Sequence, residues 1–324
     1  MPFDNLRGAP VLVTGGAGFI GSHLVDALLE LDCAVRVLDD FSTGRESNLA
    51  HCRHRIELVR GDLRHARTVA LACEERRFVF HQGALGSVPR SMEDPATTVA
   101  VNVGGTANVF AGARDAGVER VVYASSSSVY GDSERLPKVE GEEGRPLSPY
   151  ALSKKMNEDL AEMFVSCFGM ELIGLRYFNV YGPRQRPDGP YAAVIPRFFA
   201  AAVEGRAPVI YGDGEQSRDF TFVADAVRAN LLAAVTAEIR DHVAVNVASG
   251  RQTSINELAR ELFVVSGSPV PANHQAERPG DVRHSLADLA RAHAALGYSP
   301  ETDLTAGLAQ TLPHYQAVPT GGAA

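Results

Sequence analysis

Three glycines, Gly15, Gly18 and Gly21, stand at three-residue spacing between an apolar segment and an amphipathic one. Residues 11–15 have the length and composition of a buried strand, and residues 19–31 place apolar side chains at helical spacing. A glycine-rich turn from strand to helix lets the backbone approach a phosphate group at the helix N-terminus. The same pattern also suits a tight turn that binds nothing. It predicts an α/β unit that opens with strand, turn and helix.

Apolar and amphipathic segments continue to alternate through the first half of the chain. The further strand-like segments are residues 34–40, 55–62, 77–83 and 120–126. Two helix-like segments are long: residues 97–117 end at a glycine, and residues 149–169 begin with a proline and also end at a glycine. These residues are typical of helix boundaries. Regular alternation predicts a parallel sheet with helices on both faces.

The pattern changes after about residue 178, where proline, glycine and arginine become dense and the segments become irregular. Residues 242–249 again resemble a buried strand, which we expect to rejoin the first sheet. We predict an α/β fold: a doubly wound parallel sheet of the Rossmann type with a smaller mixed α/β C-terminal substrate domain. The expected divisions are residues 1–178 with about 218–250, residues 179–217 with about 251–316, and a disordered tail at 317–324.

Composition argues against several functions. The 324 residues carry a formal net charge of -8, whereas sequence-independent binding of nucleic acid needs a basic face. No apolar run approaches the ~18 residues that span a bilayer, and residues 1–10 do not resemble a secretory signal. The four cysteines, at 33, 52, 73 and 167, lack metal-ligand spacing. We therefore expect free thiols, no metal, no membrane or nucleic-acid partner, and a cytoplasmic protein.

Asp39 is expected to end the second strand, about 20 residues after the glycine turn. A carboxylate there accepts hydrogen bonds from the ribose diol of an adenosine and repels a 2′-phosphate. The position therefore favours NAD over NADP, although the nearby Arg45 could accommodate a phosphate. Asp62, after the third strand, is placed to bind an adenine amino group or, equally simply, to be a solvated loop acid.

Tyr150 and Lys154 stand four residues apart in the helix predicted at 149–169, so both side chains lie on one face. A free tyrosine has a pKa of about 10 and is a poor base near neutral pH. A neighbouring ammonium and a nicotinamide cation would both favour the phenolate. The serines at 125–128 follow a strand at the sheet edge where ligands bind, although a polar loop that caps the strand would have the same sequence. Together these residues predict an acid–base site.

Several longer motifs carry a resemblance to a known family. They are GGAGFIG (15–21), HQGALGSVPRSMEDP (81–95), SSSVYG (126–131), YALSK (150–154), RYFNVYGPRQ (176–185), GDGEQSRDF (212–220) and RPGDVRHSLAD (278–288). With them the chain resembles the extended short-chain dehydrogenase/reductases and, within these, the UDP-hexose 4-epimerases. It is similar to bacterial epimerases that act on UDP-N-acetylglucosamine and on UDP-glucuronic acid.

The resemblance implies an NAD-dependent UDP-sugar 4-epimerase with Tyr150, Lys154 and Ser126 as catalytic residues. Tyr150 would take the proton of the sugar 4-OH, NAD the C4 hydride, and the 4-keto sugar would turn before it is reduced on its other face. The implied cofactor-binding residues are Gly15, Gly18, Phe19, Ile20, Gly21, Asp39, Asp40, Gly44, Asp62, Leu63, Leu85, Asn102, Lys154 and Tyr177, with Phe178 beside the nicotinamide. The implied substrate-binding residues are Ser87, Ser127, Ser128, Asn179, Arg186, Val194, Arg218, Arg278, Asp281 and Ser285.

Two of these residues favour different sugars. Ser285 leaves room for an N-acetyl group, which suits UDP-N-acetylglucosamine. Arg186 stands where glucuronate epimerases present an arginine, which could bind a C6 carboxylate through charge-assisted hydrogen bonds. The alternative for Arg186 is a solvent-facing pair with Asp188. We expect UDP-glucuronic acid to give UDP-galacturonic acid, with a UDP-N-acetylglucosamine or UDP-glucose 4-epimerase as the alternative.

Other functions remain open on the same scaffold. Related 4,6-dehydratases and UDP-glucuronate decarboxylases keep acidic residues where this chain has Ser127 and Ser128, so dehydration or decarboxylation would lack its proton-transfer group. A dinucleotide sensor would be expected to have lost Tyr150 and Lys154. The helices at 97–117 and 149–169 resemble those through which the family forms a four-helix bundle, which predicts a homodimer, although core packing would produce the same apolar faces.

Overall fold

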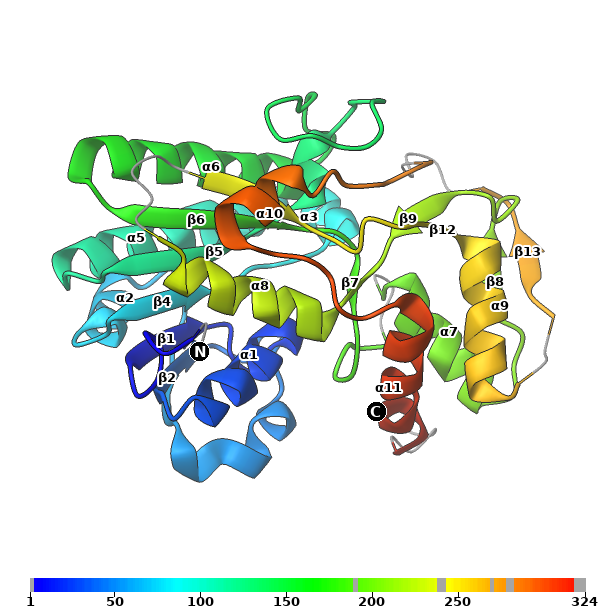
Figure 1. Ribbon diagram of the computed structural model, residues 1–324, viewed down its shortest axis with the longest axis horizontal. Helices are drawn as coiled ribbons and strands as arrows, with labels where there is room; N and C mark the ends of the chain where they lie inside the picture. Colours follow the sequence, from blue (N-terminus) through cyan, green and yellow to red (C-terminus); the bar gives the residue numbers. More distant parts are fainter. Residues whose placement is uncertain (1–2, 189–191, 238–242, 269–270, 278–282, 318–324) are drawn as a thin grey trace.

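The computed structural model describes residues 3–188, 192–237, 243–268, 271–277 and 283–317. Seven parallel strands form its main sheet, which lies in the left half of Figure 1. In spatial order they are β11 (Val243–Val247), β6 (Glu171–Tyr177), β5 (Arg120–Ser126), β4 (Phe78–His81), β1 (Pro10–Thr14), β2 (Ala34–Asp39) and β3 (Glu57–Arg60). Residues 243–247 rejoin the first sheet, as predicted, whereas β6 had no counterpart among the predicted strands.

Helices cover both faces of this sheet, which confirms the doubly wound α/β prediction. One core cluster joins the sheet to α1 (Phe19–Glu30), α8 (Val223–Val235) and α10 (Ala290–Leu296). The other core cluster joins the opposite face to α2 (Ala66–Cys73), α5 (Gly105–Asp115) and α6 (Pro149–Phe168). The strands are buried on both sides because each face packs against helices.

The helix that carries Tyr150 and Lys154 has the boundaries that the sequence predicts. Ser148 accepts a hydrogen bond from the backbone N–H of Ala151 at 3.1 Å, and α6 begins at Pro149. It ends at Gly169, whose φ of 65° continues the chain in the left-handed region. The local sequence thus fixes where this helix starts and stops.

The other predicted long helix is divided into three segments. It starts at α4 (Pro95–Val99), where the Asp94 side chain accepts from the Thr97 N–H, and continues through a π-helical segment, η3 (Ala100–Gly104), into α5. It ends at Asp115, two residues before the predicted end. Such π-helical segments interrupt α-helices frequently at functional sites.

A third apolar cluster lies in the right half of Figure 1, away from the main sheet. Its helices are α7 (Val194–Val203), α9 (Ile255–Ser266) and α11 (Leu304–Ala317). Three two-stranded pairs accompany them: β7 (Val180–Tyr181) with β10 (Thr221–Phe222), β9 (Ser217–Asp219) with β12 (Gln252–Ser254), and β8 (Val209–Tyr211) with β13 (Asn273–Gln275). Because β9 and β12 are antiparallel and the others parallel, this part is mixed α/β, as predicted.

The short elements complete the chain. They are α3 (Val88–Glu93), η1 (Glu46–Asn48), η2 (Ala50–Arg55) and η4 (Ser127–Tyr130). All four cysteines are free, three of them buried. Within the described residues, no helix has the length and apolarity needed to cross a membrane.

The strand order reverses at β1, which pairs with β2 on one side and β4 on the other. The chain leaves these strands in opposite directions, so a crevice forms beyond their carboxyl ends. Thr14, Asp39 and His81 end these three strands. In open parallel sheets this reversal is where ligands bind.

Candidate active site

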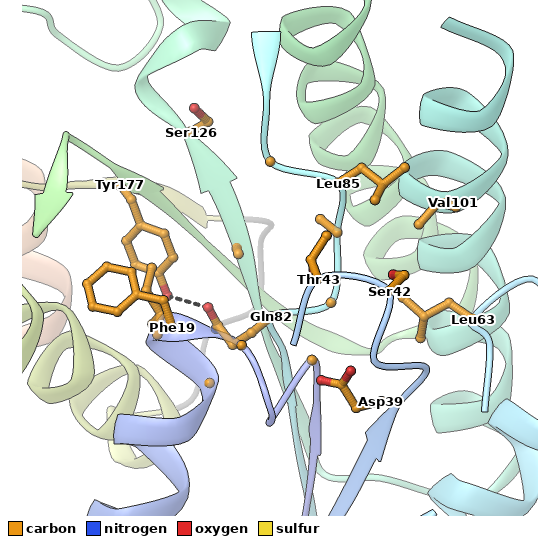
Figure 2. Close-up of a pocket in the computed structure, with 18 of the residues that line it drawn as sticks. Phe19, Asp39, Ser42, Thr43, Leu63, Gln82, Leu85, Val101, Ser126 and Tyr177 are labelled. Atoms are coloured by element: carbon orange, nitrogen blue, oxygen red, sulfur yellow. Dashed lines mark hydrogen bonds between the residues drawn. The ribbon is translucent and has the colours of Figure 1, made fainter. Parts of the chain in front are cut away.

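A cavity of about 450 Å³ opens at this reversal (Figure 2). Figure 2 shows Asp39 and Ser126 at opposite ends of it. The predicted site residues that line it are Gly15, Gly18, Phe19, Ile20, Gly21, Asp39, Asp40, Asp62, Leu63, Leu85, Ser126, Tyr150, Lys154, Tyr177 and Asn179. The topology therefore brings most of the predicted cofactor residues and all three predicted catalytic residues into one cavity.

The glycine turn is packed too closely for side chains. Gly15 has a φ of 67°, and a Cβ there would lie 2.6 Å from the Cα of Gly83. A Cβ on Gly21 would lie 2.1 Å from the carbonyl oxygen of Gly15. Helix α1 has no side-chain cap at its N-terminus, and its first turn faces the cavity. Its backbone N–H groups and the positive end of its dipole thus suit an anionic ligand such as a pyrophosphate.

Asp39 joins the end of β2 to the glycine turn. Its carboxylate accepts hydrogen bonds from the backbone N–H groups of Ala17 at 2.9 Å and Phe41 at 2.8 Å. Burial raises the pKa of this carboxyl group, and these two hydrogen bonds oppose the shift. Gly44 packs against it, since a Cβ there would lie 2.9 Å from Asp39 Oδ1. A fixed acceptor at this position suits a ribose diol.

Asp62 lines the cavity but already has a partner. Arg64 donates to both of its carboxylate oxygens, at 2.9 and 2.5 Å for the Oδ2 contacts, and holds its pKa below the usual range. The sequence allowed Asp62 to be an adenine ligand or a solvated loop acid. The structure has features of both, because Asp62 faces the cavity and is bonded to an exposed arginine. Asp40 accepts from the N–H and hydroxyl of Ser42, which also lines the cavity.

Asn102 supports the cavity wall and does not line it. Its side chain accepts from the Leu85 N–H at 2.8 Å and donates to the Leu85 carbonyl at 3.2 Å and to Ser153 at 3.0 Å. Leu85 and the neighbouring Val101 line the cavity instead. Phe178 also lies away from the cavity, fully buried in a small cluster with Tyr130. These two side chains, which were expected on the nicotinamide side, are thus not part of the cavity lining.

Tyr177 is held by two amides on the far wall. It donates to Gln82 Oε1 at 3.2 Å, the contact drawn in Figure 2, and accepts from Asn230 Nδ2 at 2.7 Å. Burial raises its pKa to about 12. Tyr177 is therefore a neutral side chain of fixed orientation.

Ser126 lines the cavity with Tyr150, and its side chain opposes the burial that raises the pKa of this tyrosine. Ser126 Oγ accepts from the Ser128 N–H at 3.1 Å and from the Ser128 hydroxyl at 2.9 Å. These two hydrogen bonds fix Ser126 at the end of β5, on the side of the cavity that Tyr150 lines.

Lys154 lies beneath the tyrosine and is almost fully buried. Its ammonium donates to the carbonyl of Ala124 at 2.8 Å and lies 6.0 Å from the centroid of the Tyr150 ring. Burial lowers the pKa of Lys154 to about 8, while Glu158 acts in the opposite direction. Burial raises the pKa of Tyr150, and the opposing effect comes from Ser126. The expectation that an ammonium and a nicotinamide cation together favour the phenolate stays a prediction, and in the structure the Lys154 ammonium is bonded to Ala124.

A second cavity, of about 260 Å³, adjoins the first. Asn179, Val180 and Gln185 line both. Val194 and Arg218 of the predicted substrate set line the second cavity, and the Asn179 amide donates to the carbonyl of Asp219 at 3.0 Å. The two cavities share this wall and together extend from the glycine turn to the mixed α/β part.

Arg186 lines neither cavity. It is 47% exposed and forms an ion pair with Asp188 at 2.6 Å, which Arg45 approaches from the other side at 3.4 Å. The structure therefore shows the solvent-facing pair that was the alternative for Arg186. Asp188 holds two arginines, one from each of two loops that flank the cavity.

The remaining predicted substrate residues lie around the cavities. Ser87 caps α3 by accepting from the Arg90 N–H, and Ser127 begins η4 beside Ser126. Ser285 is buried, and its N–H donates to the Ser217 carbonyl at 3.1 Å. Arg278 and Asp281 lie outside the described residues.

The sequence interpretation missed part of the cavity wall. The missed residues include Ser42, Thr43, Gln82, Ala84, Gly86, Val101, Ala124 and Gln185. Several follow the carboxyl ends of β2 and β4, a location that marks ligand-binding loops in a parallel sheet. That rule could have found them without any motif.

One group of side chains among the described residues has the geometry of a metal site. Potential ligand atoms of Asp26, His51 and Cys52 lie within 4.8 Å of one another. Arg184 already pairs with Asp26 at 2.7 Å and would repel a cation. We assign no metal to this group.

The parallel sheet, the glycine turn, the acidic end of β2 and the Tyr150–Lys154 pair define a short-chain dehydrogenase/reductase that uses a nicotinamide dinucleotide. Residues 11–248 match the model of the NAD dependent epimerase/dehydratase family. The chain belongs to this family.

Relatives agree with this assignment. The UDP-glucose 4-epimerase of Mycolicibacterium smegmatis is 39% identical over 309 residues, which cover 94% of this chain and 98% of the relative. A UDP-N-acetylglucosamine 4-epimerase from Methanobrevibacter ruminantium M1, solved with UDP-N-acetylmuramic acid, is 38% identical with a TM-score of 0.91, covering 95% and 98% of the two chains. The UDP-glucuronic acid 4-epimerase of Bacillus cereus, solved with UDP-glucuronic acid and NAD, is 30% identical with a TM-score of 0.87, covering 94% and 98%. The resemblance, fold, enzyme class and cofactor predicted from the sequence are therefore confirmed.

Proposed function

We propose that this chain catalyses the reversible 4-epimerisation of a UDP-sugar, with UDP-glucuronic acid and UDP-galacturonic acid as its preferred pair. The observation that supports the reaction type is that Tyr150, Ser126 and Lys154 line the same cavity as the glycine turn, and that this cavity shares Asn179 with the second one. An acid–base pair between a dinucleotide site and a second cavity is what oxidation and re-reduction of one sugar carbon requires.

We propose that residues 1–178 with about 218–250 hold NAD, and that residues 179–217 with about 251–316 hold the nucleotide-sugar. The cofactor residues fit NAD because the close-packed glycine turn admits no side chain and the first turn of α1 faces the cavity. The fixed carboxylate of Asp39 suits the adenosine ribose of NAD. Arg218, in the second cavity, suits the pyrophosphate of the substrate.

In this mechanism Tyr150 accepts the proton of the sugar 4-OH and Ser126 hydrogen-bonds the same oxygen. NAD held by the glycine turn and Asp39 would supply the acceptor and donor of the C4 hydride, so that the 4-keto sugar can be reduced on its other face. To accept this proton Tyr150 must first be a phenolate, and the Lys154 ammonium, 6.0 Å from its ring centroid, would favour that form together with the positive charge of a bound nicotinamide. Tyr150 then returns the proton to the new 4-OH.

The carboxylates of the site favour epimerisation over elimination. Among the described residues that line the two cavities, the carboxylates are those of Asp39, Asp40 and Asp62. Asp39 ends β2, Asp40 follows it and Asp62 follows β3, so all three lie at the end of the cavity that we assign to adenosine, whereas Ser127 and Ser128 follow Ser126. A dehydratase or decarboxylase would need a proton-transfer group beside Tyr150.

The preference for glucuronate rests on Arg186 and on the Bacillus cereus relative. In the structure Asp188 gives Arg186 a carboxylate partner, and a C6 carboxylate of the substrate would have to replace it. The alternatives are UDP-N-acetylglucosamine and UDP-glucose, which have no carboxylate to offer. We propose that the C6 carboxylate of UDP-glucuronic acid replaces Asp188 as the partner of Arg186, and that the two neutral sugars leave this ion pair in place.

Turnover of UDP-glucuronic acid and UDP-N-acetylglucosamine by the Arg186→Ala protein tests this preference. We expect at least about a tenfold loss of kcat/KM for glucuronate, the scale of one lost charge-assisted hydrogen bond, and little change for the N-acetyl sugar. Arg45→Ala is the matched control, because Arg45 also contacts Asp188 but belongs to the adenosine-side loop. Unchanged glucuronate turnover in Arg186→Ala, or a wild type that acts only on N-acetyl sugars, would refute the preference.

We also propose a homodimer formed through the α4–α5 helix and α6. Their apolar side chains Val99, Leu152, Met156 and Met163 are 36–47% exposed, and the two helices already contact each other. Leu152→Glu should give a monomer by light scattering, whereas Val264→Glu, on the exposed face of α9, should leave the dimer intact. The compartment that we propose is the cytoplasm, because the four thiols are free.

A further inference from the structure

Four charged side chains form a cluster behind the cavity. They are Lys154 and Glu158 on α6, Arg176 on β6 and Glu143 in the loop that precedes α6. Lys154, Glu158 and Arg176 are at most 4% exposed. The cluster holds two positive and two negative charges, as burial requires.

Glu158 is at the centre of this cluster. Its Oε1 accepts from the Ser125 hydroxyl at 2.6 Å and from Arg176 Nε at 2.8 Å, and its Oε2 accepts from Arg176 Nη2 at 2.7 Å. Arg176 also pairs with Glu143 and donates to Tyr130 Oη at 3.1 Å. Glu158 lines neither cavity, so it does not contact a ligand there.

The contacts of Glu158 lead directly to the proposed catalytic residues. Ser125 stands between Ala124, whose carbonyl binds the Lys154 ammonium, and Ser126, which lines the cavity together with Tyr150. Lys154 and Glu158 are four residues apart on α6, so their side chains are neighbours on one face. One carboxylate thus holds the strand that carries Ser126, through Ser125, and lies one helical turn from Lys154.

We propose that Glu158 is a positioning residue of the active site, which holds the end of β5 against α6 and keeps Lys154 charged. The proposal rests on the roles given above to Tyr150, Ser126 and Lys154. The second carboxylate, Glu143, pairs with Arg176 and ties the loop before α6 to β6. The two carboxylates therefore hold different parts of the chain, although both pair with Arg176.

The surroundings of Lys154 make its charge depend on Glu158. Burial lowers its pKa to about 8, and Glu158 is the group that opposes this shift. The other titratable neighbours are Tyr150 on the same helix and His81 on β4, whose burial keeps it neutral. Tyr123 of β5 faces Glu158 and is fully buried, and burial raises its pKa well above the usual value. Glu158 is thus the carboxylate that supports the ammonium.

The chain offers a direct measurement, because it contains three lysines, Lys138, Lys154 and Lys155. NMR titration of the holoenzyme carrying 13Cε-lysine would give three midpoints, assigned by Lys138→Arg and Lys155→Arg. We expect the Lys154 midpoint to fall in Glu158→Gln by about 1 pH unit, the low end of what one nearby opposite charge does. The alkaline limb of kcat should move to lower pH by the same amount, while KM changes less than about twofold.

The matched control is Glu171→Gln. Glu171 pairs with Arg120 at the opposite ends of the same two strands, so the variant breaks a comparable ion pair away from Lys154. It should lose stability without moving the Lys154 midpoint. Glu158→Asp keeps the negative charge but moves it away by one methylene, so the Lys154 midpoint should fall by less than in Glu158→Gln. This variant provides the test if Glu158→Gln does not fold.

An unchanged Lys154 midpoint in the folded Glu158 variants would overturn the proposal. The same holds if Glu171→Gln moves the midpoint as far as Glu158→Gln does. The titration does not depend on turnover. A wild type without epimerase activity would contradict the proposed function and leave this result to be judged separately.

Discussion

The Ser126 oxygen accepts hydrogen bonds from both the N–H and the hydroxyl of Ser128, which fixes Ser126 in the wall of the cavity that Tyr150 also lines. The ammonium of Lys154 lies 6.0 Å from the centroid of the Tyr150 ring and donates to the carbonyl of Ala124. Burial raises the pKa of Tyr150, so the phenol is protonated near neutral pH before ligands bind. The side chains of the site are therefore positioned before ligands bind, whereas the pKa of Tyr150 depends on the charge of the bound cofactor.

The first prediction concerns Tyr150→Phe. We expect kcat to fall by about 10²- to 10⁴-fold, the usual contribution of a general acid–base group, with nearly unchanged affinity for the UDP-sugar. Tyr298→Phe is the control, because its hydroxyl donates to the Ala248 carbonyl at 2.9 Å away from the cavities. It should cost about 1 kcal/mol of stability and no turnover. A Tyr150→Phe enzyme with near-normal kcat would remove the tyrosine from the mechanism.

The second prediction concerns the glycine turn. Gly21→Ala places a Cβ 2.1 Å from the Gly15 carbonyl oxygen. This contact is with the backbone, which cannot move aside by a change of rotamer, so the turn itself must shift. We expect loss of bound nucleotide, measured by absorbance of the released cofactor, together with a lower Tm. Gly104→Ala is the control, since its Cβ would meet no atom within 4 Å. Its helical backbone predicts a gain of about 0.4–1 kcal/mol. Normal NAD content in Gly21→Ala would contradict this account of the turn.

The third prediction concerns acid stability. His81 accepts from the Thr14 hydroxyl at Nδ1 and donates to Thr106 from Nε2, because the Thr106 hydroxyl itself donates to the Asn102 carbonyl. Full burial lowers the pKa of His81 to about 3 from 6.5. Between about pH 6.5 and pH 3, His81 is therefore protonated in the unfolded chain and neutral in the folded one.

The sign follows from this depressed pKa. The contribution of His81 to the free energy of unfolding is fully present above about pH 6.5. It declines as the pH falls toward about 3, by at most about 1.4 kcal/mol per pH unit. Denaturant unfolding between about pH 7 and 4 should show a shallower decline in His81→Gln than in the wild type. Equal slopes would mean that His81 titrates normally in the folded protein.

The fourth prediction concerns the choice of dinucleotide. The Asp39 carboxylate is fixed by Ala17 and Phe41 where a 2′-phosphate would meet its charge. Arg45 is engaged with Asp188 at 3.4 Å. The apoenzyme should bind NAD more tightly than NADP in a calorimetric titration, and Asp39→Asn should narrow the difference. A wild type that prefers NADP would refute the ribose assignment.

The sequence predicted the sheet, the glycine turn and the shared helix face of Tyr150 and Lys154 from local patterns, whereas Ser126 was singled out by the family resemblance. Strand periodicity, a proline at the start of α6 and a glycine at its end act within a few residues. The chain order of such segments then places their ends in one crevice. Local rules therefore sufficed for the frame of the site.

Individual side-chain directions could not be predicted in this way. Asn102 stands at a cofactor position of the motif, yet its amide binds the backbone of Leu85. Arg186 pairs with a residue two places along its own loop, and no periodicity separates that outcome from a ligand contact. The role of Glu158 depends on β6 lying beside β5, a pairing between segments about 50 residues apart.

The most direct test of the central claim is to incubate the purified protein with UDP-glucuronic acid and follow the sugar by proton NMR and NADH by absorbance. We expect the 4-epimer to appear until equilibrium is reached, without added NAD and without accumulation of NADH, because the hydride returns to the same carbon. Stoichiometric NADH, or release of carbon dioxide without any 4-epimer from this sugar or other UDP-sugars, would contradict the assignment of this chain as a UDP-sugar 4-epimerase.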